Sequence, residues 1–188
     1  MMNSCKKNGI LVSLARFFRD RRGISAVEFA IIFPLMALIY LGGTATTQGI
    51  VIKRKVTITT RTVGDLVSQY TSITNAQKDA VFQAAVAVMS PYPTPIGTMT
   101  IVVSSVNITA AGVATIGWSD GYNTTGRAPG SSVTLPTGLS VAGKATSVIW
   151  AEAVYSYRPP VGAAFFSAIP LTEQFFLTPR RVTTITRS

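Results

Sequence analysis

The hydrophobic pattern of the chain begins with a long apolar run that follows a basic segment ending at Arg22. The 30 residues 23–52 contain a single residue that is charged at neutral pH, Glu28. A membrane-spanning helix needs roughly 20 apolar residues, so the run predicts a transmembrane helix over residues 24–52. A carboxylate in such a helix costs roughly 2.5–3.5 kcal/mol at mid-bilayer and somewhat less near the interface, and Glu28 lies near the helix end. We therefore expect Glu28 to have a partner.

Beyond the run, apolar residues recur at three- and four-residue steps, which is the period of one helix face. These residues are Ile52, Val56, Val63, Leu66, Val67 and Tyr70. Polar residues fall largely between them, namely Thr57, Thr59, Thr60, Arg61 and Asp65. The first helix is therefore predicted to continue to about Tyr70, with one apolar stripe facing a globular domain.

A second helix is predicted from a capping box at Thr74 and Gln77. It runs through an Ala-rich stretch to Met89, and its apolar positions are Val81, Phe82, Ala85, Val86 and Met89. Three prolines at positions 91, 93 and 95 end it.

The remaining pattern is that of strands and turns. Residues 99–108 are rich in β-formers, and their apolar phase flips near Ser104, which indicates a bulge. A turn at residues 110–112 leads into 113–118, a predicted hairpin. Residues 119–146 are rich in turn residues. A strand over 146–158 places Ile149, Ala151, Ala153, Tyr155 and Tyr157 on one face, and a final strand or pair is expected around 174–178 and 182–186, interrupted by Pro179. The prediction is an α+β fold with a long N-terminal transmembrane and amphipathic helix, a second short helix and a small antiparallel β-sheet domain.

The junction at residues 22–29 carries the most specific motif. Cleavage after Gly23 would make Ile24 the N-terminus and Glu28 the fifth residue. A free α-amino group is largely protonated at neutral pH, with a pKa of about 7.7–8, so it can neutralise Glu28 of a staggered neighbour. Glycine, four residues and then Glu-Phe resembles the prepilin-peptidase junction of type IV pilins. With the continuation at residues 30–35, it resembles the TadE/TadG-like pseudopilins (minor pilins) of the tight-adherence (Tad) pilus system.

The resemblance implies both a fold and a role. Looser similarities in the same family order are found at residues 116–119, 135–136 and 154–159, and Pro34 inside the apolar helix also fits. It implies a pilin-like architecture, cleavage between Gly23 and Ile24, and recognition and assembly roles for Glu28 and Phe29. The implied function is assembly of Tad-type pili for surface attachment. The implied partners are a prepilin peptidase, other pilin and pseudopilin subunits, the inner-membrane pilus assembly machinery and the lipid bilayer.

The implied cleavage site and the apolar run give three expected segments: a basic leader peptide 1–23, a transmembrane helix 24–52 and an extracytoplasmic α+β domain 53–188. The formal charge of +10 divides equally, since residues 1–23 carry six basic residues and one acidic residue, and the rest carries 11 basic and six acidic residues. The bias of basic residues modestly favours a cytoplasmic N-terminus, and cytoplasmic processing in the family supports it. We expect a single-pass protein of the inner (cytoplasmic) membrane with a periplasmic domain, which later enters the pilus. Scattered basic residues do not indicate nucleic-acid binding.

Candidate chemistry is sparse, and we predict that the chain is not an enzyme. It has no histidine, and Cys5 is its one cysteine, so the commonest general base and any internal disulfide are excluded. The acidic residues of the domain are far apart in sequence and predict neither a carboxylate pair nor a metal site. Residues 120–123 (Asp-Gly-Tyr-Asn) are read as an ordinary turn and not a calcium loop. Glu152 is expected to pair with Arg158 or with a backbone group. No cofactor is predicted.

Two alternatives to the pseudopilin interpretation stay open. A signal-anchored periplasmic binding module, not incorporated in a filament, would keep its N-terminus intact and would not need Glu28. A cleaved secretory signal is also conceivable, because residues 43–45 (Gly-Thr-Ala) have the small-x-small pattern of a signal-peptidase site.

Overall fold

The computed structural model describes residues 23–136, 138–139, 145–159 and 167–188. The predicted basic leader lies almost entirely outside these residues. By its internal contacts the chain divides into a unit that ends at Ala45 and a unit Thr46–Ser188. Helix α2 (Ile24–Ser68) contributes to both, and its residues 24–45 belong to the first unit.

Residues 24–45 are an apolar helix with most side chains exposed. The large exposed residues include Ile31, Leu38, Ile39 and Tyr40. Among the described helices, α2 alone is long and apolar enough to cross a membrane by length and composition. The prediction of a long N-terminal apolar helix is therefore confirmed, and the structure agrees that it is suited to anchor the chain in a membrane.

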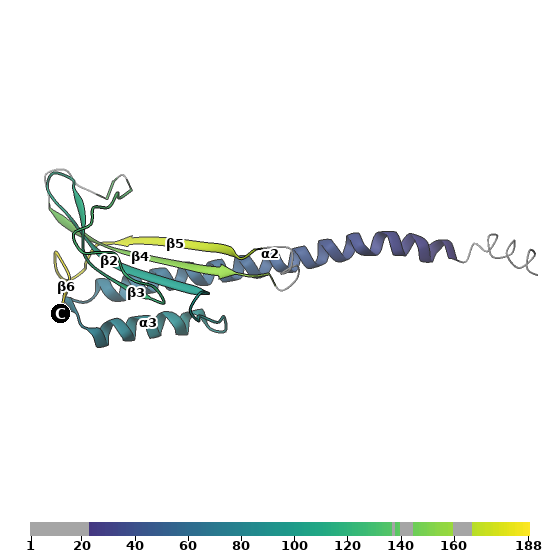
Figure 1. The fold of residues 1–188 in the computed structure, drawn as a ribbon, viewed down its shortest axis with the longest axis horizontal. Coiled ribbons are helices and arrows are strands. Elements are labelled where there is room, and N and C mark those ends of the chain that lie inside the picture. The colour runs from purple at the N-terminus through teal and green to yellow at the C-terminus, as the bar shows by residue number, and fades with distance from the viewer. Residues whose placement is uncertain (1–22, 137, 140–144, 160–166) are drawn as a thin grey trace, which may run out of the picture. The chain divides into compact units, whose positions relative to one another are not determined.

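The second unit contains the α+β fold that the sequence predicts (Figure 1). Its elements are the remainder of α2, β1 (Ser72–Ile73), α3 (Asn75–Met89), β2 (Met99–Ile108), β3 (Ala114–Tyr122), β4 (Thr146–Tyr157), β5 (Ile169–Leu177) and β6 (Thr186–Arg187). Strands β2 to β5 form one antiparallel sheet in the order β3-β2-β4-β5, and β1 pairs with β6 in parallel.

The main core lies between the helices and one face of this sheet. Helix α2 contributes Ile52, Val56, Val63 and Val67, and α3 contributes Val81, Phe82, Ala85 and Met89. The five residues that the sequence places on one face of β4 are all buried in or beside this core. Gly64 brings α2 close to the sheet, because a Cβ there would stand 3.4 Å from the Cβ of Ala151.

Local signals in the sequence predicted the end of α2, the start of α3 and the bulge in β2. Helix α2 ends at Ser68, two residues before the predicted Tyr70, a difference usual for helix ends. The capping box is confirmed, since the Gln77 amide donates to Thr74 Oγ1 at 3.3 Å and the Thr74 amide donates to Gln77 Oε1 at 2.9 Å. The bulge near Ser104 is confirmed by a register shift between Ser105 and Val106.

Several predictions were wrong. Residues 120–122 are the end of β3 and not a turn, because they pair with residues 101–103 of β2. The final strand is a single β5 that starts at Ile169, and β6 is a two-residue strand that pairs with β1, which the sequence did not predict. Thr59 and Thr60 are buried on the helix face where only apolar residues were expected. Thr60 is accommodated there because its hydroxyl donates to the Val56 carbonyl at 2.8 Å.

Candidate functional site

The predicted site residues lie at the start of α2. Gly23 directly precedes the helix, and a Cβ at this position would meet no atom within 4 Å. Ile24 is the first residue of α2, so it and Glu28 are four residues apart on one helix face. Phe29 is exposed and contacts the ring of Phe33 at 5.5 Å between centroids.

Glu28 is exposed and forms no hydrogen bond or ion pair with another described residue. Its carboxylate is therefore available to a group outside this part of the chain. Its neighbours along the helix are apolar and exposed as well, so the surface around it is one that an apolar environment would cover.

The acidic residues of the second unit, unlike Glu28, have basic partners. Each of the five lies in an ion pair with a lysine or an arginine. The pairs are Lys53–Glu173, Lys78–Asp79, Arg127–Glu152, Arg180–Asp65 and Arg187–Asp120. The described part of the chain also contains no group of three His, Cys, Asp or Glu residues placed to hold a metal ion. No carboxylate in this unit is left without a basic partner.

The pairing of Glu152 corrects a prediction. Its carboxylate meets the guanidinium of Arg127 and not Arg158. Arg127 also stacks over the Trp150 ring, with its Cζ 4.0 Å from the ring centroid. The chain after β3 returns along the free edge of that strand, where Thr115 bridges to Ser132, and Arg127 of this return contacts Glu152 and Trp150 of β4.

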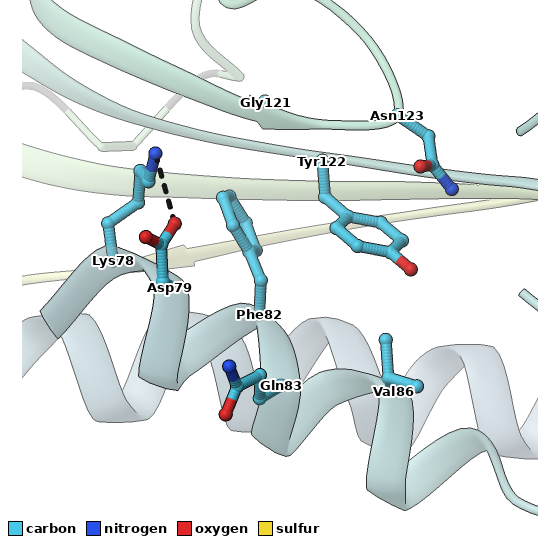
Figure 2. Close-up of a pocket in the computed structure, with 8 residues that line it drawn as sticks. All are labelled: Lys78, Asp79, Phe82, Gln83, Val86, Gly121, Tyr122 and Asn123. Atoms are coloured by element: carbon cyan, nitrogen blue, oxygen red, sulfur yellow. Dashed lines mark ion pairs between the residues drawn. The ribbon is translucent and has the colours of Figure 1, made fainter. Parts of the chain in front are cut away.

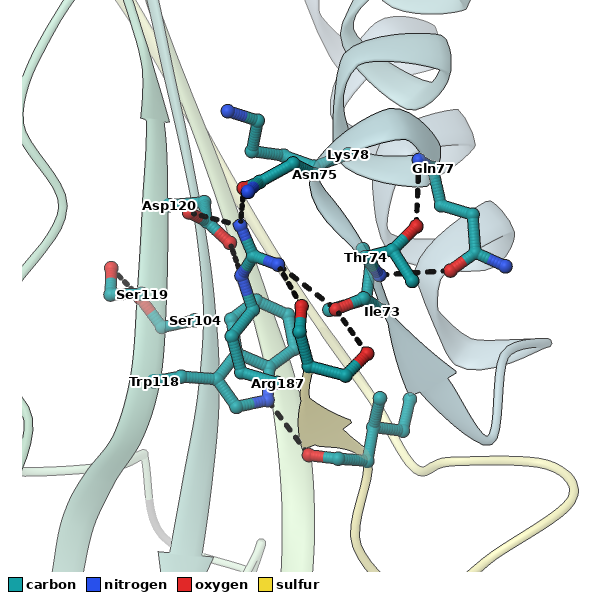
Figure 3. A network of polar contacts seen from close by, with 12 residues as sticks. Ile73, Thr74, Asn75, Gln77, Lys78, Ser104, Trp118, Ser119, Asp120 and Arg187 are labelled. Carbon is teal, nitrogen blue, oxygen red and sulfur yellow. Dashed lines mark hydrogen bonds and ion pairs between the residues drawn. The ribbon is translucent and has the colours of Figure 1, made fainter.

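Arg187 closes the C-terminal end of the domain (Figure 3). Its Nε donates to Asp120 at 2.9 Å, one Nη donates to the Ile73 carbonyl at 3.0 Å, and the other donates to Asn75. Nearby, Trp118 Nε1 donates to the Ile185 carbonyl at 2.7 Å. Asp120 thus fastens the last strand to the sheet, which explains its position without a bound cation.

A groove of about 490 Å³ lies between α3 and the end of β3 (Figure 2). It is lined by Lys78, Asp79, Phe82, Gln83, Val86, Gly121, Tyr122 and Asn123. The Phe82 and Tyr122 rings are 5.8 Å apart, and Lys78 pairs with Asp79 at 3.1 Å. Tyr122 and Asn123 both donate to the Thr94 carbonyl, so the polar groups at this end hold the loop after α3.

Sequence reasoning missed this groove, since its two walls are about 40 residues apart along the chain. The aromatic pair and the amphipathic α3 were visible in the sequence, but the register that joins them was not.

Comparison with known proteins gives no relative: no protein family, no curated protein and no solved structure matches the chain.

Proposed function

We propose that this protein is a minor pilin or pseudopilin of the TadE/TadG-like class, which is processed by a prepilin peptidase and serves assembly of a Tad-type pilus for surface attachment. The observation that carries the proposal is the junction itself. A glycine is followed, after four residues, by the single described carboxylate without a basic partner, in an exposed apolar helix.

In this proposal Gly23 offers the peptidase an unhindered peptide, because no neighbouring atom approaches its Cβ position. Cleavage turns Ile24 into the N-terminal residue and creates a protonated α-amine at the lipid boundary. That amine neutralises Glu28 of an adjacent subunit, which removes the cost of a carboxylate in lipid and sets the register between subunits.

The apolar segment first lies in the inner membrane and later packs against other subunits. The N-terminus is cytoplasmic and the domain is periplasmic, as the positive-inside bias modestly favours. The first turn of α2 contains no acidic residue. Glu28 lies beyond this turn, where the helix dipole has little effect on a carboxylate. The amine of a second subunit is therefore the partner that we propose for Glu28.

The domain contributes binding surfaces and no catalytic step. Its five carboxylates are held in ion pairs, and its main core is the α+β layer described above.

The groove of Figure 2 favours a second candidate, a signal-anchored periplasmic binding module that does not enter a filament. This candidate requires neither cleavage at Gly23 nor a carboxylate at position 28.

A complementation experiment separates the two. Cells that lack the protein are supplied with the wild type, Glu28→Gln or Glu28→Asp, and piliation and surface attachment are counted. We expect Glu28→Gln to reduce piliation at least tenfold while the protein level stays normal, and Glu28→Asp to retain part of it because it keeps the charge. Piliation at the wild-type level with Glu28→Gln would contradict the assembly role.

A further inference from the structure

A second hollow of about 610 Å³ lies at the end of the domain where the apolar stretch of the chain finishes. Three segments line it: α2 at Gln48 and Ile52, the loop after α3, and the end of β4. The loop and strand residues that matter here are Tyr92, Ile96, Tyr157 and Arg158. We call these four residues the tyrosine rim.

The loop that carries Ile96 is fixed by hydrogen bonds at both ends. The Thr94 carbonyl accepts from the Tyr122 hydroxyl at 3.3 Å and from Asn123 Nδ2 at 2.9 Å. The Ser156 amide donates to the Thr98 carbonyl at 2.8 Å. Despite this, the Ile96 side chain is 83% exposed. The fold therefore keeps the Ile96 side chain exposed to solvent, and this side chain contributes little hydrophobic stabilisation to the domain.

The tyrosines combine an apolar ring with a neutral hydroxyl. Burial, and then the nearby Tyr92, raise the pKa of Tyr157 and of Tyr155 above the ordinary value of 10.0. Tyr157 also lies against α2, because a Cβ on Gly49 would stand 3.3 Å from its ring. Tyr155 and Tyr157 are buried in the core, so the half-buried Tyr92 is the tyrosine that can meet the headgroup region of a bilayer, where tyrosines are enriched.

Arg158 differs from three of the six other arginines of the domain. Arg127, Arg180 and Arg187 each pair with a carboxylate. Arg158 is exposed and makes no hydrogen bond or ion pair with another residue that the structure describes. A planar guanidinium binds phosphate through two parallel hydrogen bonds, so a phosphate group is the partner that its chemistry fits.

Chain length places this hollow at the lipid boundary, on the premise of the proposed function that the apolar helix spans a membrane. Residues 29–48 would extend about 30 Å at 1.5 Å per residue, which matches the hydrocarbon thickness of a bilayer. Gln48 and Ile52 then lie where the chain leaves the lipid, and Lys53, Arg54 and Lys55 follow directly.

We propose that the tyrosine rim is a membrane-interface anchor that binds anionic lipid. Ile96 enters the region below the headgroups, the half-buried Tyr92 lies at headgroup level, and Arg158 holds a lipid phosphate. This contact fixes the height and tilt of the domain on the membrane before the subunit is taken into an assembly.

The test uses the full chain in vesicles, with Cys5→Ser as background and an environment-sensitive fluorophore on Ile96→Cys. The vesicles are phosphatidylcholine alone or an equimolar mixture with phosphatidylglycerol. We expect a blue-shifted emission that lipid-attached quenchers reduce and aqueous iodide does not, more so with phosphatidylglycerol. Ala111→Cys, an exposed position in the turn beyond the opposite end of β2, is the control and should be quenched by iodide alone. Iodide quenching at Ile96→Cys equal to that at Ala111→Cys would overturn the proposal.

Arg158→Gln tests the phosphate contact. We expect it to lower the lipid-to-water ratio of the Ile96→Cys probe about fivefold in the mixed vesicles, as the loss of one basic residue at an anionic surface predicts. The matched control is Arg181→Gln. Arg181 is also exposed and has no partner among the described residues. It lies near the C-terminal end of α2, because the amide of its neighbour Arg180 donates to the Ser68 carbonyl. An unchanged ratio for Arg158→Gln, or loss of the phosphatidylglycerol effect on adding inorganic phosphate at matched ionic strength, would overturn the assignment to a lipid headgroup.

Alkaline extraction of the same vesicles separates this inference from the proposed function. If the chain stays in the lipid pellet while the fluorophore at Ile96→Cys is quenched by aqueous iodide, only the proposed lipid contact of the tyrosine rim is overturned. A chain that is extracted would remove the membrane span on which both proposals rest.

Discussion

Apolar side chains before and after Ala45 differ in what covers them. Ile39 is 64% exposed in the first unit, whereas Ile149 is 0% exposed in the second. In the second unit the sheet and α3 cover one apolar face of the helix, where Ile52, Val56, Val63 and Val67 are buried. In the first unit no described part of the chain does so, and under the proposed function lipid or another subunit supplies the cover.

The same contrast holds for charge. The carboxylates after Ala45 are paired within the domain, and Glu28 is not. The comparison teaches that the carboxylates of the domain are paired within it, whereas Glu28 on the apolar helix has no described partner.

The largest expected effect comes from removing matched apolar side chains on the two sides of this comparison. Ile149→Ala should lower the free energy of unfolding of the domain by about 2–5 kcal/mol, because it leaves a cavity in the core. Ile39→Ala should change it by less than about 0.5 kcal/mol. Urea unfolding of the detergent-solubilised full chain, followed by fluorescence of Trp118 and Trp150, measures both. Equal losses would show that the exposed helix is part of the folding unit.

The second prediction concerns the closure of the domain by Arg187. Arg187→Ala should lower the free energy of unfolding by about 2 kcal/mol, because Asp120 and the Ile73 carbonyl lose a charged hydrogen-bond donor. Arg187→Lys should recover only part of this, since an ammonium cannot reproduce the guanidinium fork. Arg181→Ala is the control and should leave the urea midpoint unchanged. A midpoint for Arg187→Ala that equals the control would contradict the structural role of this network.

A smaller loss is expected for Gly97→Ala. Gly97 has a φ of +82°, which costs a residue with a Cβ about 1–2 kcal/mol. Ile96→Ser is the neighbouring control, and it should change the unfolding free energy by less than about 0.5 kcal/mol because the side chain is exposed. The same urea titration compares them. Equal stability of Gly97→Ala and the wild type would mean that the loop rearranges freely, and the tyrosine rim would not be fixed by the fold.

The smallest effect is electrostatic. The hydrogen bond from Lys53 holds the pKa of Glu173 below its usual 4.5. A carboxylate with a lowered folded-state pKa stabilises the fold above the unfolded-state pKa, and this contribution is lost as the pH falls through the folded value. Glu173→Gln should therefore lower the free energy of unfolding by about 0.5 kcal/mol at neutral pH. Below about pH 4.5 the free energy of unfolding of this variant should fall less steeply than that of the wild type.

Glu28→Gln is the matched control for this pH series, because Glu28 lies outside the domain. Its unfolding free energy should follow the wild type at every pH. If Glu173→Gln follows the wild type as well, the Lys53–Glu173 pair contributes nothing measurable to the domain.

Local patterns in the sequence predicted the helices, the main strands and the bulge, because each rests on neighbours within a few residues. The apolar face of β4 and the Thr74 capping box are the clearest cases. The sequence could not predict the β1–β6 pair, since two residues at each strand carry no periodicity and their partners are over 110 positions apart.

The same limit applies to the site. The junction at Gly23 and Glu28 is a contiguous motif, so the sequence carried all of its signal. The Arg127–Glu152 and Arg187–Asp120 pairs depend on how distant segments meet, and sequence order pointed to Arg158 instead. Burial of Thr60 was also hidden, because only its bond to the Val56 carbonyl makes a hydroxyl compatible with the core.

The most direct test of the account is the intact mass and N-terminal sequence of the membrane-extracted protein, from cells with and without the prepilin peptidase. The account predicts a chain that begins at Ile24 when the peptidase is present and keeps residues 1–23 when it is absent. A chain that keeps residues 1–23 in both strains would contradict it and favour the anchored binding module. A chain that begins at Thr46 would contradict it in favour of a cleaved secretory signal.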